Sequence, residues 1–147
     1  MKVIIVLFVV LILVVLVSAS YLNGKGILFT SKGSTVTIGA NTFAVEVEKT
    51  PAAREQGLSG RSSLQADHGM LFLFDTPDRY AFWMKDMYFP LDIIWILDGK
   101  VVYLEKNVPA NFSGIIDPPT DANQVLEINA GNADKTGINE GDKVVSF

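Results

Sequence analysis

The sequence has 147 residues, a length typical of one domain, and contains no cysteine, which excludes disulfides, thiolate metal sites and a cysteine nucleophile. The 12 Lys and Arg residues against 16 Asp and Glu give a formal net charge of −4. A mildly acidic chain without a basic run is not expected to bind nucleic acid.

The N-terminus is strongly apolar. After Met1 and Lys2, residues 3–17 are fifteen consecutive apolar residues, and the small residues Ser18 and Ala19 follow. This pattern is typical of a signal peptide, although about 20 residues are also enough for a transmembrane helix. We therefore expect residues 1–22 to be a signal peptide or a transmembrane anchor, a hydrophobic helix that contacts the membrane. The protein would then be membrane-anchored or secreted, with its domain on the extracytoplasmic side.

The next segment, residues 23–34, is rich in Gly, Ser and Lys and is predicted to be a linker, so that the domain proper spans residues 35–147. Residues 36–38 and 42–48 are predicted to form a hairpin around Gly39-Ala40-Asn41. In residues 42–48 the side chains alternate between apolar and polar or small, which is the pattern of a half-buried strand.

A short helix is predicted over residues 50–57. Thr50 can cap its N-terminus, Pro51 suits the first helical position, and Gly57 can adopt the left-handed conformation that often ends a helix. A second helical turn is predicted at residues 133–136, just before Gly137.

The other predicted elements are short strands, with Asp75-Thr76-Pro77-Asp78 as a turn and Asp98-Gly99 as a hairpin signal. These strands cover residues 70–74, 79–84, 91–97, 100–105, 125–129 and 143–147. Many short strands and few helices indicate a mainly β (α+β) fold, a small barrel-like or sandwich domain with one or two short helices.

Six motifs occur in a fixed order between the first helix and the C-terminus. They are Arg54-x-x-Gly57-Leu58-x-x-Arg61, Asp67-x-Gly69-Met70-Leu71-Phe72, Phe82-Trp83-Met84-Lys85-Asp86, Pro90-Leu91-Asp92-Ile93, Leu126-Glu127-Ile128-Asn129-Ala130-Gly131 and Gly137-Ile138-x-x-Gly141-Asp142. Together they closely resemble the prokaryotic domain-of-unknown-function family 192, over residues 43–147. The resemblance implies a compact, mostly β domain, commonly behind an export signal or membrane anchor, and it implies no activity.

Asp92 is the most unusual position of the sequence. By alternation it shares a strand face with Ile94 and Ile96, where a carboxylate is costly to desolvate unless a cation and hydrogen bonds satisfy it. Arg54, Arg61 and Lys85 are the available cations. Asp92 is then either a functional acid–base or ligand-binding group, or a structural tie that holds residues 50–61 onto the sheet, and we favour the tie.

The two arginines form a second candidate site. If Arg54 and Arg61 converge on a concave surface, they can bind a carboxylate or a phosphate. The alternative is that one arginine pairs with Asp92 or Glu127 and that the other is solvated.

The Phe82–Asp86 motif is the third candidate. On a strand, Trp83 and Lys85 share one face and Asp86 lies on the other, so that Trp83 either lines a pocket beside Lys85 or is simply a core residue, the more common case. His68 is the only histidine, and we expect neither a metal site nor a cofactor.

We expect an extracytoplasmic binding or accessory module rather than an enzyme, because no complete catalytic constellation is present. Its ligand would be a small anionic molecule, a saccharide or a partner protein of the envelope. One alternative is a hydrolase that uses Asp92 or Asp86 as acid–base, and another is a structural envelope protein with Asp92 in a buried salt bridge. The candidate binding residues are Arg54, Arg61, Trp83, Lys85, Asp86, Asp92 and Glu127.

Overall fold

The computed structural model describes residues 33–146. The apolar segment predicted at residues 1–22 and most of the linker predicted at residues 23–34 lie outside this range. Within residues 33–146, no helix has both the length and the hydropathy needed to cross a membrane.

Seven strands form one sheet, and each of them falls on or next to a stretch of β-branched and aromatic residues. The strands are β1 (Thr35–Ile38), β2 (Asn41–Glu48), β3 (His68–Asp78), β4 (Leu91–Leu97), β5 (Lys100–Val108), β6 (Ala122–Asn129) and β7 (Val144–Ser146). Their order in the sheet is β5-β4-β6-β3-β2-β1-β7. Strands β2 and β3 pair in parallel, since α2 connects them, and the other neighbours are antiparallel.

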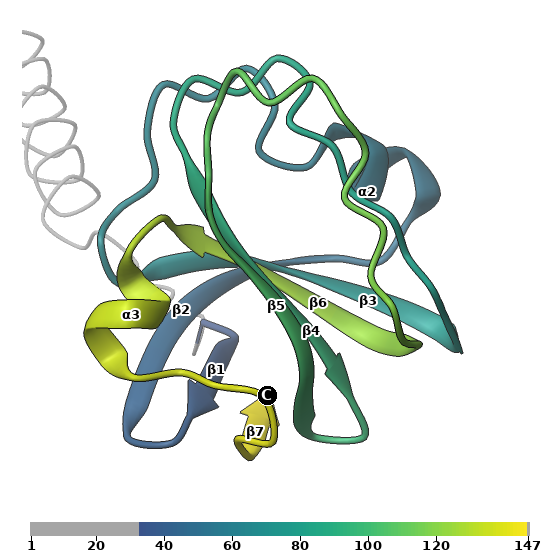
Figure 1. The fold of residues 1–147 in the computed structure, drawn as a ribbon, viewed down its shortest axis with the longest axis vertical. Coiled ribbons are helices and arrows are strands. Elements are labelled where there is room, and N and C mark those ends of the chain that lie inside the picture. Colours follow the sequence, from purple (N-terminus) through teal and green to yellow (C-terminus); the bar gives the residue numbers. More distant parts are fainter. Residues whose placement is uncertain (1–32, 147) are drawn as a thin grey trace, which may run out of the picture. The chain divides into compact units, whose positions relative to one another are not determined.

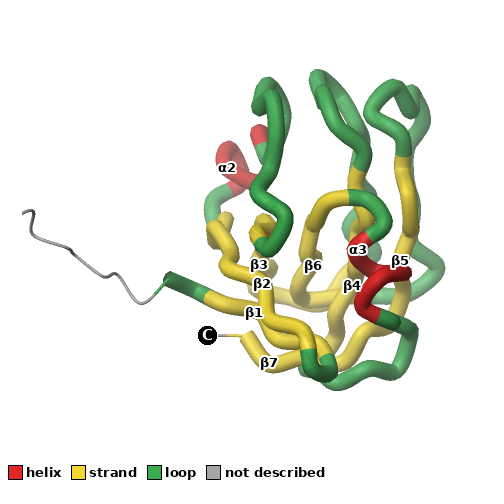
Figure 2. The backbone as a smooth tube through the Cα atoms, turned by 90° about the vertical axis from the view of Figure 1, so that its left-hand side faces the viewer, coloured by secondary structure: helices red, strands yellow, loops and turns green. Residues whose placement is uncertain are grey.

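The sheet curls into a half-barrel, because its two edge strands approach each other at one end. The amide of Val101 donates to the carbonyl of Asp142 at 2.9 Å, and the amide of Val144 donates to the carbonyl of Gly99 at 2.8 Å. At the other end, the loops before β3, β4 and β6 rise together above the sheet (Figures 1 and 2). The prediction of a mainly β domain with short helices is confirmed.

Two short helices follow the predicted positions. Helix α2 spans Pro51–Gln56, where the hydroxyl of Thr50 accepts a hydrogen bond from the amide of Ala53 at 3.2 Å. Gly57 ends this helix with a φ of 49°, a conformation that favours glycine. Helix α3 spans Asn132–Thr136.

The sheet is buried on both faces. On β4, Ile94 and Ile96 pack against the β1–β2 hairpin and α3, whereas Ile93 and Trp95 pack beneath the loops. The continuous apolar run of β4 therefore supplies side chains to both halves of the core, as its sequence predicts.

One predicted strand is absent. Strand β3 continues through Asp78, across the predicted turn, and the predicted strand at residues 79–84 is a loop in which only Phe82 pairs, with Ile116. The reason lies in the ladder between β3 and β6, whose register shifts between Leu73 and Asp78. Pro77 falls inside this shift, so its missing N–H costs no regular ladder bond.

Candidate functional site

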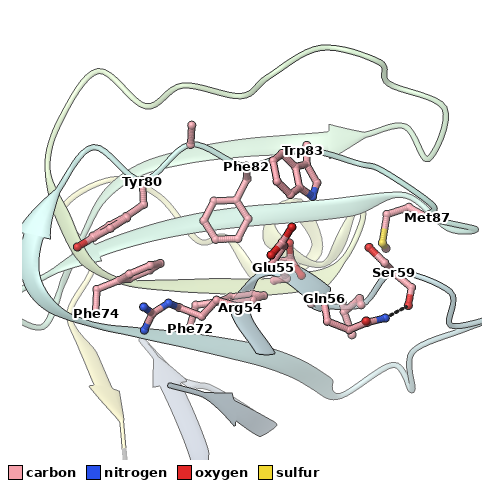
Figure 3. A pocket seen from close by; sticks show the side chains of 14 residues that line it. Arg54, Glu55, Gln56, Ser59, Phe72, Phe74, Tyr80, Phe82, Trp83 and Met87 are labelled. Carbon is pink, nitrogen blue, oxygen red and sulfur yellow. Dashed lines mark hydrogen bonds between the residues drawn. The ribbon is translucent and has the colours of Figure 1, made fainter. Parts of the chain in front are cut away.

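A pocket lies between α2, the end of the sheet and the loop that follows β3. Its volume is about 180 Å³, and aromatic side chains form most of its walls (Figure 3). In Figure 3, Tyr80, Phe82 and Trp83 follow one another on one side, and Phe72 and Phe74 lie on the other side with α2.

The aromatic walls hold one another in place. Phe72 and Phe74 are two residues apart on β3 and so project from the same face. Phe82 meets Phe72 edge to face with centroids 5.1 Å apart, and Tyr80 stacks on Phe74 with centroids 3.5 Å apart. Trp83 is 44% exposed and forms part of the rim. The walls are thus rigid, and the rim is open to solvent.

Glu127 is the lining residue with the most unusual environment. It lies on the central strand β6, opposite Met70 of β3 and Ile93 of β4, and only 5% of it is exposed. Its Oε2 atom has no hydrogen-bond partner among the described residues. Burial raises the pKa of the Glu127 carboxyl from 4.5 to about 8, so the group is protonated at neutral pH.

Asp92 is buried completely, but both of its carboxylate oxygens accept hydrogen bonds, unlike Oε2 of Glu127. Its Oδ1 accepts the amide of Asn107 at 2.8 Å, and its Oδ2 accepts the amide of Ala133 at 2.8 Å. Asn107 lies where the register of β5 shifts against β4, with a φ of 57°, so its amide is directed at the carboxylate and not into the ladder.

The prediction that Asp92 needs a positive side chain is therefore wrong, because two backbone amides satisfy it. Asp92 is a structural tie, because its hydrogen bonds hold α3 and the part of β5 around Asn107 to β4. It does not hold residues 50–61 onto the sheet. Since none of Asp92 is exposed, it cannot act on a substrate as the acid–base of a hydrolase.

Arg54 and Arg61 do not converge. The Nη1 atom of Arg54 donates to the carbonyl of Lys49 at 2.6 Å and to that of Leu73 at 2.8 Å, and its guanidinium lies 4.7 Å from the centre of the Phe74 ring. This side chain anchors α2 to the edge of the pocket.

Arg61 lies outside the pocket. It forms a bidentate ion pair with Glu46, with one nitrogen–oxygen distance of 2.7 Å, which lowers the pKa of the Glu46 carboxyl. Because the two guanidinium groups have separate partners, the predicted anion site is not formed by this pair.

The Phe82–Asp86 motif lies on a loop, so the predicted strand faces do not exist. Trp83 is exposed at the rim, and the prediction that it is a core residue is wrong. The carbonyl of Lys85 accepts the hydroxyl of Ser59 at 2.8 Å, and the carbonyl of Asp86 accepts the amide of Gly60 at 2.9 Å. The side chains of Lys85 and Asp86 do not line the aromatic pocket, but Trp83 and Lys85 both line a second, more open pocket with residues 110–115, as the alternative prediction for Trp83 stated. The motif's backbone instead fixes the turn after α2.

Among the predicted candidates, Arg54, Trp83 and Glu127 thus line one pocket, whereas Arg61, Lys85, Asp86 and Asp92 lie elsewhere. The aromatic walls were not predicted as a site. The available signal was Glu127 itself, a lone carboxyl within the apolar run of β6, the same signal that singled out Asp92. Within residues 33–146, no cluster of His, Asp or Glu is suited to a metal ion.

A family model described as DUF192, Uncharacterized ACR, matches residues 34–146. This chain belongs to the DUF192 family. No curated protein matches its sequence.

Two solved structures resemble this DUF192 chain. One is described as a "putative transcription regulator" from Sinorhizobium meliloti 1021, with 33% identity, a TM-score of 0.72, and coverage of 77% of this chain and 91% of that chain. The other is a protein of unknown function from Novosphingobium aromaticivorans DSM 12444, with 34% identity, a TM-score of 0.71, and coverage of 82% and 91%. The DUF192 fold is thus shared with both, and neither description supplies a ligand.

Proposed function

We propose that this DUF192 domain is a binding module whose pocket receives one ring-sized, mainly apolar group of a small ligand. The observation that carries the proposal is the carboxyl of Glu127, which lines a pocket with aromatic walls and whose buried Oε2 atom has no hydrogen-bond partner within residues 33–146. An unpaired buried polar group costs about 1–3 kcal/mol, and a ligand that pairs with it recovers that free energy on binding.

The size of the pocket supports a single ring. Its volume of about 180 Å³ compares with about 150 Å³ for an apolar cavity that binds benzene. Walls of phenyl, phenol and indole groups favour a flat apolar partner, because aromatic rings attract one another in stacked and edge-to-face arrangements.

The same walls make a saccharide a weaker candidate. A sugar ring carries a hydroxyl on most of its carbons, and each hydroxyl buried without a partner is costly. A simple anion is also disfavoured, because Arg61 is paired with Glu46 outside the pocket and the lining carries two carboxyl groups, Glu55 and Glu127, against the single guanidinium of Arg54.

The Sinorhizobium relative is described as a "putative transcription regulator", but a role in DNA binding finds no support in the charge of this chain. A net charge of −4 opposes contact with phosphate groups. The predicted export of the domain remains a part of our proposal and depends on residues 1–22.

Saturation-transfer NMR on the full chain, with phenol and indole as probes, tests the proposal. We expect saturable binding that Phe82→Ala weakens, because this change removes one wall, whereas Arg61→Ala, outside the pocket, leaves binding unchanged. Circular dichroism would establish that both variants are folded. Absence of any transfer to either probe, or equal binding by the wild type and a folded Phe82→Ala variant, would overturn the proposal.

A further inference from the structure

We propose that the group bound in this pocket is an organic cation, an ammonium carried on a small ring, with the Glu127 carboxylate as its counter-ion. This inference rests on the proposed function and names the ligand class of the same pocket.

The lining of the pocket has an electrostatic character that suits a cation. The faces of aromatic rings are electronegative, and a cation over such a face is attracted to it. The structure already contains one example at the edge of the pocket, where the guanidinium of Arg54 lies 4.7 Å from the centre of the Phe74 ring. Among the aromatic residues of the walls, Trp83 is 44% exposed and offers a similar surface to a ligand.

The charged groups around Glu127 also favour a cation. The strands on both sides present Met70 and Ile93 opposite it, which are apolar. Besides Glu127, the titratable residues that line the pocket are Arg54 and Glu55 from α2 and Tyr80 from the loop after β3. Arg54 is the only cation among them, and its Nη1 atom is held by two backbone carbonyls. Within residues 33–146 the carboxyl of Glu127 forms no ion pair, and burial alone raises its pKa, so an incoming cation can pair with it.

The total charge of the complex favours a cationic ligand as well. An ammonium group paired with a carboxylate leaves the buried site neutral overall, and the pair is strong because little water surrounds it. An anionic ligand would meet two carboxyl groups, those of Glu55 and Glu127, against one lining cation, Arg54. A neutral aromatic ligand would form one hydrogen bond to the protonated carboxyl and would stack on the walls, but the ring faces would offer it no attraction for a positive charge.

A cation that binds Glu127 must displace its proton. Since burial raises the pKa of this carboxyl to about 8, the group is mostly protonated at pH 7 before binding. On binding, the proton leaves for the buffer, the carboxylate forms, and the ammonium takes its place as the positive partner. Proton release is thus a signature that simple apolar binding would not produce.

Isothermal titration calorimetry of the full chain at pH 7 tests this with benzylammonium, benzyl alcohol and benzoate, which share one ring and differ in charge. We expect benzylammonium to bind at least about tenfold more tightly than benzyl alcohol, and benzoate to bind most weakly. Titrations in phosphate and in Tris, which differ in ionisation enthalpy, should show release of close to one proton for each benzylammonium bound and none for benzyl alcohol.

The matched variant is Glu127→Gln, which keeps the shape of the side chain and cannot ionise. It should lose the preference for benzylammonium over benzyl alcohol and the proton release. Should this variant fail to fold, the wild type supplies the test, because its preference for benzylammonium should increase between pH 6 and pH 8 as Glu127 deprotonates.

The outcomes separate this inference from the proposed function. Equal affinity for benzylammonium and benzyl alcohol without proton release, or tighter binding of benzoate, would overturn the cation inference and leave the aromatic binding pocket in place. If none of the three compounds binds, both the inference and the proposed function fail.

Discussion

Ionisation of Glu127 should make the folded domain less stable as the pH rises from about 5.5 to about 7.5. The carboxyl has a pKa of about 8 when folded, against an ordinary value of 4.5 when unfolded. Between these values the folded state holds a proton that the unfolded state has lost. The stabilising effect is therefore complete below the unfolded pKa and is lost as the pH approaches and passes the folded pKa.

The size of the effect follows from these two pKa values. Each pKa unit corresponds to about 1.4 kcal/mol, so the full difference between 8 and 4.5 amounts to about 5 kcal/mol. Integrated from pH 5.5 to pH 7.5, the loss in the free energy of unfolding is about 2 to 3 kcal/mol. The lowered pKa values of Glu46, Asp67 and Asp134 act in the opposite direction. Their contributions are lost at lower pH, as each folded carboxyl takes up its proton.

Urea unfolding of the full chain at a series of pH values, followed by tryptophan fluorescence, measures this slope. Trp95 is completely buried and reports on the core. The control is Glu127→Gln, whose free energy of unfolding should change little over the same interval, whatever its absolute stability. A wild-type slope equal to that of Glu127→Gln would refute the reasoning, because it would show that Glu127 ionises equally easily in both states.

Three further predictions concern single side chains. Asp92→Asn should lower the free energy of unfolding by about 2–4 kcal/mol in thermal or urea unfolding, because an amide group can accept only one of the two backbone N–H groups. An unchanged melting temperature would contradict the structural role of Asp92. Gly69→Ala should destabilise by about 1–3 kcal/mol, since a Cβ there would lie 2.8 Å from the carbonyl oxygen of Glu127, whereas Gly33→Ala, with nothing within 4 Å, should be nearly neutral in the same assay. Trp83→Ala should weaken phenol binding in the NMR assay, because Trp83 lines the pocket. It should change the free energy of unfolding by less than about 1 kcal/mol, because Trp83 is 44% exposed. A large loss of stability would show that Trp83 is a core residue.

Local patterns in the sequence predicted most of the elements correctly. The alternation in residues 42–48 gave a half-buried strand, and Thr50 with Gly57 marked the two ends of the first helix, because strand faces and helix caps depend on residues within a few positions of one another. The continuous apolar run of β4 likewise required burial on both faces. The motifs also identified the family.

Pairing between distant residues was decided by the tertiary structure. The sequence showed that Asp92 is buried and needs donors, but not that the donors are the amides of Asn107 and Ala133, the second of which lies 41 positions away. Every residue except proline carries such an amide, so the sequence does not indicate which amide will be the partner. The sequence suggested an arginine as the partner of Asp92, and that prediction was wrong. Glu127 has the same kind of sequence signal and no such partner, because the fold surrounds it with aromatic walls and not with backbone donors.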